Sequence, residues 1–179
     1  MKLPGLRALK MSNSGKTDGE VFRIWEAGIT HKNLLRIPTP LLTLNGYAFS
    51  LKTPVINNFQ QLDDVQRIGI QRGIIWAESY VGPRKGIVRV TTVSELVDKL
   101  LAGAIDVALA TEDGVETEIR RRNLNMPLYV GTPIITFNVY HYLHKRNKNL
   151  VDRVDKEIRK MLVTNEIEKI SKFPFHNIN

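Results

Sequence analysis

The sequence predicts an α/β fold, and three observations support this prediction. Short apolar segments typical of strands alternate with amphipathic segments typical of helices along most of the chain. Two of the helix-like segments end at a glycine that is followed directly by a strand-like segment. Hydrophobic residues make up 42% of the 179 residues, a share that is normal for a packed core. Because strands that alternate with helices favour parallel pairing, the sheets are expected to be mostly parallel.

The first third of the chain predicts a short helix and two strands. The helix at residues 6–12 ends before Gly15, because glycine readily adopts the left-handed conformation that closes a helix. A strand is expected at residues 21–25, and a proline-rich passage at 37–40 follows it. Alternating apolar residues predict the second strand at residues 46–51.

The middle of the chain predicts strands that alternate with helices. Either Thr92 or Ser94 can cap the helix that begins near them. The helix at residues 112–122 has acidic residues first and arginines last, which matches the helix dipole. The other elements expected here are strands at 67–71, 87–91 and 107–110 and helices at 74–80 and 94–102.

The last third predicts strands at 128–130 and 134–143 and an amphipathic helix at 150–163. In the longer strand, Tyr142 and His144 share one face while His141 lies on the other. Because His141 and His144 then point in different directions, no metal site is predicted.

The chain carries a net charge of +8, and the excess lies in its two flanks. Residues 1–50 hold seven basic and three acidic side chains, residues 136–179 hold nine and five, and the middle holds ten of each. A nucleic-acid-binding arm usually concentrates its charge in one run. The only such run, Arg120-Arg121-Arg122, is interpreted as a solvated helix end, with an anion or phosphate contact as the alternative. No nucleic-acid partner is predicted.

Several classes of protein are excluded by features that the sequence lacks. Without cysteine there is no disulfide, thiolate metal site or cysteine nucleophile. The longest apolar run, Leu100–Ala110, is interrupted by Asp106 and is too short to span a membrane. No nucleophile elbow, zinc motif, Walker loop or dinucleotide-binding motif is present, so no enzyme activity, catalytic residue, metal or cofactor is predicted. No export signal is expected, because no apolar stretch follows the first residues.

One pattern occurs twice in the chain. A helix ends at Gly15 and reaches Asp18 three residues later, and a second helix ends at Gly103 and reaches Asp106. The repeat favours two similar α/β lobes, although corners of this kind are also common by themselves. Both aspartates are predicted to shape their corners rather than to contact a ligand.

Together these segments resemble the type 2 periplasmic binding proteins, the amino-acid-type extracellular solute-binding family of ABC importers. The resemblance covers about residues 6–172 and depends on the order of its parts. These are the two Gly-x-x-Asp corners, Val65–Gly73, Thr92–Leu109 and Thr164–Ile170. It implies two α/β lobes joined by a two-strand hinge, the first formed by residues 1–51 and 137–179 and the second by residues 52–136.

The family's first lobe opens with a strand, a helix and a second strand ahead of the helix at residues 6–12, and these are absent here. The first lobe is therefore expected to be incomplete, with an uncovered sheet edge. A homodimer or a strand exchange is expected to cover that edge.

The resemblance also implies a ligand site in a cleft between the lobes. Arg72 is suited to pair with a carboxylate or phosphate, Trp76 to wall the site, and Thr111 and Glu112 to bind a polar group. The alternatives are a surface charge for Arg72, a core position for Trp76 and a helix N-terminal acid for Glu112. The candidate ligand-binding residues are Arg23, Trp25, Gln71, Arg72, Gly73, Ile74, Trp76, Thr111 and Glu112.

The implied function is capture of a small polar or anionic molecule for ABC-type import or for sensing. The resemblance places such a protein in the periplasm, with an ABC permease as a candidate partner. The alternative is an effector-binding or nucleic-acid-associated regulatory domain without enzyme activity.

Overall fold

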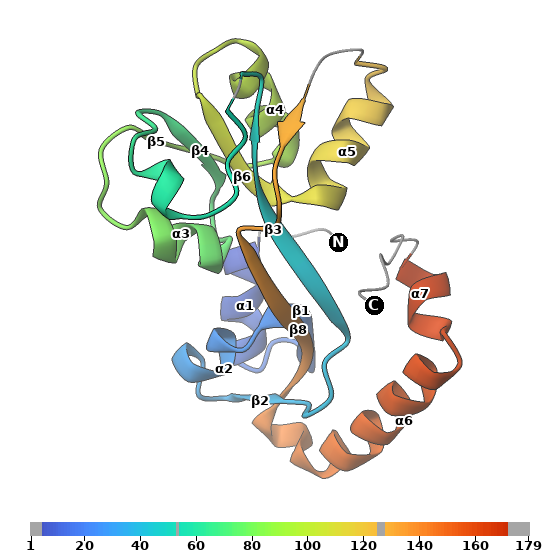
Figure 1. Ribbon diagram of the computed structural model, residues 1–179. Helices are drawn as coiled ribbons and strands as arrows, with labels where there is room; N and C mark the ends of the chain where they lie inside the picture. Colours follow the sequence, from blue (N-terminus) through green and yellow to red (C-terminus); the bar gives the residue numbers. More distant parts are fainter. Residues whose placement is uncertain (1–4, 53, 125–127, 172–179) are drawn as a thin grey trace. The chain divides into compact units, whose positions relative to one another are not determined.

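The computed structural model describes residues 5–52, 54–124 and 128–171 (Figure 1). The described residues form two compact units. Unit 1 comprises Met1–Thr43 and Phe137–Asn179, and unit 2 comprises Leu44–Thr136. The chain passes from one unit to the other within two long strands, β3 (Leu42–Ser50) and β8 (Ile135–His144). The 51/52 boundary predicted from the sequence lies just past the far end of β3.

Unit 1 is built around β8, the strand that carries its central aromatic residues. Strands β1 (Gly19–Ile24) and β2 (Leu34–Arg36) both pair with β8 in antiparallel register. Helices α1 (Gly5–Asn13) and α2 (Glu26–Thr30) pack on one face of these strands. The core between them consists of Leu9, Ala27, Leu34, Tyr140 and Tyr142. A 3-10 turn, η2 (Lys145–Leu150), leads to α6 (Val151–Val163) and α7 (Glu166–Ser171).

Unit 2 contains a sheet in which β4 (Ile68–Gln71) pairs in parallel with β5 (Ile87–Val90) and with β6 (Val107–Thr111). Strand β3 pairs in antiparallel register with β6 and with the short strand β7 (Tyr129–Val130). The remaining elements of the unit are η1 (Gln60–Leu62), α3 (Ile75–Val81), α4 (Val93–Leu101) and α5 (Glu112–Arg121).

The prediction of mostly parallel sheets was wrong. Strand β4 pairs in parallel with β5 and with β6. The pairs β1 with β8, β2 with β8, β3 with β6 and β3 with β7 are antiparallel. Helical crossovers, which impose parallel pairing, join only β4, β5 and β6. The long strands β3 and β8 come from distant parts of the chain, so no crossover sets their direction.

Helices α4 and α5 cover the face of the unit 2 sheet that carries Tyr47 and Phe49. The apolar side of α4 supplies Leu96, Val97 and Leu100 to this core. Of the two caps considered from the sequence, Thr92 is the one that the structure uses, because its hydroxyl accepts a hydrogen bond of 3.1 Å from the Glu95 backbone N–H.

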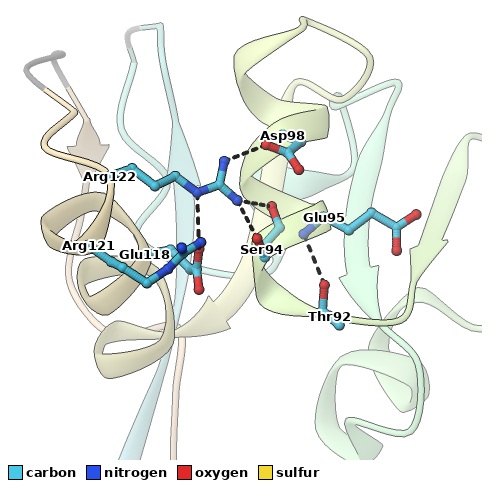
Figure 2. Close-up of polar contacts among 7 residues, drawn as sticks. All are labelled: Thr92, Ser94, Glu95, Asp98, Glu118, Arg121 and Arg122. Carbon is cyan, nitrogen blue, oxygen red and sulfur yellow. Dashed lines mark hydrogen bonds and ion pairs between the residues drawn. The ribbon is translucent and has the colours of Figure 1, made fainter.

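Arg122 joins α5 to α4 (Figure 2). Its guanidinium donates to the Glu118 carboxylate at 3.1 Å and to the Ser94 carbonyl oxygen at 2.9 Å, and it also pairs with Asp98. Arg121 and Arg122 hold the pKa of Glu118 below its usual range. The interpretation of the arginine run as a solvated helix end is therefore wrong for Arg122, whose side chain is 19% exposed and bridges two helices.

The two Gly-x-x-Asp corners have the same local structure. Gly15 and Gly103 both have positive φ, at 76° and 64°, as expected for glycines that close a helix. In unit 1, Arg146 donates to the Gly15 carbonyl at 2.6 Å and to Asp18 at 2.8 Å.

In unit 2, Arg67 donates to the Gly103 carbonyl at 2.7 Å and to Asp106 at 2.5 Å. The arginine in each unit lowers the pKa of its aspartate. The structural role predicted for both aspartates is confirmed by these contacts. We call these two arrangements the arginine-bound corners.

Strand β1 is irregular and partly exposed. Its register against β8 contains a bulge between Glu20 and Arg23, and Phe22 within that bulge has a φ of 58°. Val21 and Phe22 are 45% and 44% exposed. These apolar side chains are compatible with the homodimer or strand exchange expected from the sequence, which stays a prediction.

Candidate functional site

The candidate residues of unit 2 other than Trp76 lie at one edge of its sheet. Strands β4 and β6 run in parallel, with Ile70 opposite Leu109, so their carboxyl ends lie side by side. The segment Gln71–Ile74 therefore lies beside Thr111, although about 40 residues separate them in the sequence. In open α/β sheets, ligands bind outside the carboxyl ends of parallel strands.

Gln71 and Arg72 differ in how their side chains are used. The Gln71 side-chain amide donates a hydrogen bond of 3.1 Å to the Thr91 carbonyl, which ties the end of β4 to the end of β5. The Arg72 backbone N–H donates to the Val90 carbonyl at 2.9 Å, but its side chain is exposed. No carboxylate among the described residues forms an ion pair with Arg72. Arg72 is thus a fixed backbone position with an available guanidinium.

Gly73 and Ile74 form the turn from β4 into α3. Gly73 has a φ of 82°, and Ile74 is extended and precedes the first residue of α3. The Ile74 N–H donates to the Gln71 carbonyl at 3.3 Å. This tight turn holds Arg72 at the sheet edge.

Thr111 and Glu112 lie where β6 ends and α5 begins. Thr111 has extended dihedral angles, and its side chain makes no capping hydrogen bond. Burial and the neighbouring Glu112 carboxylate raise the pKa of Tyr47, a β3 residue opposite Ala110. The sequence did not single out Tyr47 as part of this edge, because only strand pairing brings β3 beside β6.

Trp76 is 6% exposed and belongs to the interior of unit 2. A Cβ placed on Gly46 would lie 2.9 Å from the Trp76 ring and 2.7 Å from Ile135. The indole therefore packs against the bare backbone of β3 on the face opposite Phe49. Trp76 therefore occupies a core position, which was the alternative that the sequence left open for it.

In unit 1, Arg23 is occupied by contacts within the unit. Its guanidinium donates to Glu20 at 2.7 Å and to the Gly5 carbonyl at 3.0 Å. These bonds join β1 to the start of α1.

Trp25, directly after β1, has a different environment. Its side chain is 50% exposed, and its ring contacts Tyr140 edge to face with the centroids 6.2 Å apart. The Arg36 guanidinium lies 2.9 Å from the centroid of the Trp25 ring. Neither Arg36 nor Tyr140 was a candidate site residue in the sequence. Arg36 lies on β2, a strand that the sequence did not predict, and Tyr140 comes near Trp25 only because β8 pairs with β1.

Unit 1 also contains an apolar groove of about 450 Å³ between α6 and the face of β8 opposite Tyr142. His141 reaches this groove, as its alternation with Tyr142 predicted. Charged groups that line the groove with it are Arg153 and Glu157. Burial lowers the pKa of His141 below its usual value of 6.5.

We expect unit 1 to lose stability as the pH falls below about 6.5. Burial disfavours the charged form of the His141 imidazole in the folded protein, so the unfolded chain binds this proton at a higher pH. The stabilisation is complete above pH 6.5 and declines as the pH approaches the lowered pKa of the folded state. Thermal melts between pH 7 and pH 5 measure this decline. His141→Gln should flatten this decline, and an unchanged decline in that variant would contradict the assignment.

Two further features of the described residues bear on function. Residues 5–52, 54–124 and 128–171 contain no group of three or more His, Cys, Asp or Glu side chains suited to hold a metal ion. No helix in that part of the chain has the length and apolar character needed to cross a membrane.

Comparison with known sequences gives a relative that matches most of this chain. No protein-family model matches the chain. A protein of Shewanella oneidensis that is described as uncharacterized is 28% identical over 170 residues, which are 89% of this chain and 62% of the relative. The chain thus spans less than two thirds of the length of that relative.

Solved structures are similar to this chain over most of its length. The GluR0 ligand-binding core in complex with L-glutamate has a TM-score of 0.78 at 12% identity, covering 96% of this chain and 78% of that one. A histidine kinase sensor domain with similarity to periplasmic binding proteins has a TM-score of 0.78 at 18% identity, covering 94% and 74%. The amino-acid ABC transporter substrate-binding protein AbpA from Streptococcus pneumoniae, bound to L-arginine, has a TM-score of 0.73 at 20% identity, covering 94% and 72%. The predicted type 2 periplasmic-binding-protein-like fold is therefore confirmed.

Proposed function

We propose that this chain is a solute-binding protein or domain that captures a small polar or anionic molecule. The observation that carries the proposal is the fold of the chain, which is shared by the GluR0 ligand-binding core in complex with L-glutamate and by the substrate-binding protein AbpA bound to L-arginine. Unit 2 supports the proposal because Arg72 and Thr111 meet at the carboxyl edge of parallel strands. The proposal includes no enzyme activity.

Import and sensing are both compatible with this proposal. Similarity to amino-acid ABC transporter proteins favours import, with an ABC permease as partner and a periplasmic location. Similarity to a histidine kinase sensor domain favours sensing.

A thermal-shift screen of the purified chain tests the proposal. The screen contains amino acids, small carboxylates and polyamines, each added in excess. A ligand that binds only the folded protein and is present at 100 times its dissociation constant adds about 2.7 kcal/mol to the free energy of unfolding. The melting temperature of the protein should therefore rise clearly. A well-folded preparation that none of these compounds stabilises would contradict the proposal.

Arg72→Gln tests the contribution of unit 2. The substitution should weaken binding of an anionic ligand about tenfold or more, because a charge-assisted hydrogen bond to the ligand is lost. Titration calorimetry with the compound from the screen measures the change. Lys85→Gln is the matched control, since Lys85 is an exposed cation of the same unit away from the edge. Equal affinities in the two variants would remove Arg72 from the site.

A further inference from the structure

Arg36 is held against two aromatic rings in unit 1. Its Cζ atom lies 2.9 Å from the centroid of the Trp25 ring and 4.9 Å from the centroid of the Tyr140 ring. The two rings meet edge to face, with an interplanar angle of 74°. A guanidinium stacked in this way is attracted by the ring quadrupole, and stacking leaves the N–H groups at its planar edge available.

The position of each part of this cluster is fixed by the fold. Arg36 is the last residue of β2 and lies opposite Tyr142 of β8. The Tyr142 hydroxyl lies 3.0 Å from both the Ile24 and Trp25 carbonyl oxygens, to which it donates. Tyr142 is fully buried, so the backbone that carries Trp25 is anchored to the core. The stacking surface for Arg36 is thus formed before any ligand arrives.

Arg36 differs from most other arginines of unit 1 in its lack of a carboxylate partner. Arg23, Arg146 and Arg159 form ion pairs with Glu20, Asp18 and Asp155. No described carboxylate forms an ion pair with Arg36, and neither of its Nη nitrogens donates a hydrogen bond to a described residue.

The interior end of the Arg36 guanidinium is closed. Its Nε atom is buried and has no hydrogen-bond partner in the described part of the chain. Burial is the main cause of the raised pKa of Tyr142. The Glu26 carboxylate, at the exposed start of α2, also raises this pKa, and the Arg36 guanidinium lowers it. Charge compensation for Arg36 must therefore come from its Nη side, where the N–H groups are free.

We infer that Arg36, stacked on Trp25, binds the carboxylate of a small organic ligand. The two Nη groups match the two oxygens of a planar carboxylate, and a negative charge there would supply the counter-charge that no described carboxylate gives the guanidinium. The half-exposed Trp25 ring offers an apolar surface to the carbon atoms next to the carboxylate. The inference rests on the proposed function, because it names the ligand chemistry and a residue that recognises it.

Titration of the ¹⁵N-labelled full chain with succinate tests this assignment directly. The neutral diamide succinamide and inorganic phosphate are titrated in parallel. We expect succinate to shift the Trp25 indole N–H and the Arg36 Nε–H signals saturably, with little response to succinamide. Equal responses to succinate and succinamide, no response to succinate, or a stronger response to phosphate would overturn the assignment of a carboxylate.

Variants of the cluster provide the second measurement. Arg36→Gln should weaken succinate binding about tenfold or more, and Arg36→Lys should restore little of it because lysine lacks the planar fork. Arg7→Gln, which removes an exposed positive charge from α1 of the same unit, should leave the affinity unchanged. The titration of the unaltered chain decides the question even where a variant folds poorly.

The outcomes separate this inference from the proposed function. A compound from the thermal-shift screen that binds Arg36→Gln as tightly as the unaltered chain would overturn the role of Arg36 and leave solute binding in place. If no compound in the screen stabilises the chain and succinate gives no response, the proposed function and the role of Arg36 are both contradicted.

Discussion

Replacing Tyr142 with alanine should lower the free energy of unfolding of unit 1 by about 3–5 kcal/mol. Tyr142 is the largest of the side chains with less than 2% exposure in the described core. A Cβ at Gly28 would lie 3.0 Å from its ring, so the ring packs directly on the backbone of α2. The cavity left by alanine would lie between the helices and β8, where little can collapse to fill it.

Tyr142→Phe is the matched control for the Tyr142→Ala prediction. It keeps the ring and removes only the hydroxyl that donates to the Ile24 and Trp25 carbonyls, so the expected cost is about 1 kcal/mol. Urea unfolding can be followed in each unit through the indole N–H signals of the ¹⁵N-labelled chain, because Trp25 lies in unit 1 and Trp76 in unit 2. Similar losses in the two variants would show that ring packing is not the main contribution. Because the hydroxyl anchors the backbone of Trp25, Tyr142→Phe should also weaken succinate binding.

Gly86→Ala should strongly destabilise unit 2, by about 3 kcal/mol or more. Gly86 has a φ of 77°, and a Cβ there would lie 1.9 Å from the Gln66 carbonyl oxygen. Its own carbonyl accepts a hydrogen bond of 3.1 Å from the Ile68 N–H at the start of β4. Since backbone atoms form both contacts, relief requires β4 and the start of β5 to move apart.

Gly103→Ala separates the two causes of the stability loss in Gly86→Ala, which are the left-handed backbone conformation and the contact with the Gln66 carbonyl oxygen. Gly103 also has a positive φ, of 64°, but a Cβ there would meet nothing within 4 Å. The left-handed conformation alone should cost about 1–2 kcal/mol. Chemical denaturation of both variants, followed at Trp76, gives the comparison. A loss in Gly86→Ala no greater than that in Gly103→Ala would show that the contact with Gln66 is relieved without cost.

Local signals in the sequence were sufficient for most elements. Helix α4 was expected from its apolar spacing and from the Thr92 cap, and both are present because each depends on residues within a few positions. The same holds for Gly15 and Gly103, whose conformations follow from their places at helix ends. The alternation of Tyr142 with His141 also correctly predicted two different environments.

Regular structure that the sequence did not predict lies in residues 26–36, between the strand expected at 21–25 and the proline-rich passage. Helix α2 has five residues and strand β2 has three, and segments this short carry too few residues to show a period. They form because β8 offers partners and because α2 packs on Tyr142. Arg36 was missed for the same reason, since its place beside Trp25 depends on the pairing of β2.

The candidate site also combines features that the sequence predicted with features that depend on strand pairing. The sequence placed Gln71–Ile74 and Thr111 at strand ends, and the parallel register of β4 and β6 brings these ends to one edge. It could not distinguish a buried Trp76 from an exposed one, because that depends on the bare Gly46 backbone opposite the ring. Nor could it show that Arg23 is bonded to Glu20 while Arg72 is not paired in this way.

The sequence by itself determined the α/β class, the order of most elements and the two helix–glycine–aspartate corners. These depend on spacing, caps and turn residues, which act over a few positions. Only the tertiary structure decided the strand directions, the arginine that binds each corner and the stacking of Arg36 on Trp25. Arg67 lies 39 residues from Asp106, and Arg146 lies 128 residues from Asp18. The physical reason is that such contacts depend on which strands pair, and pairing is set by burial of the whole core rather than by neighbours in the chain.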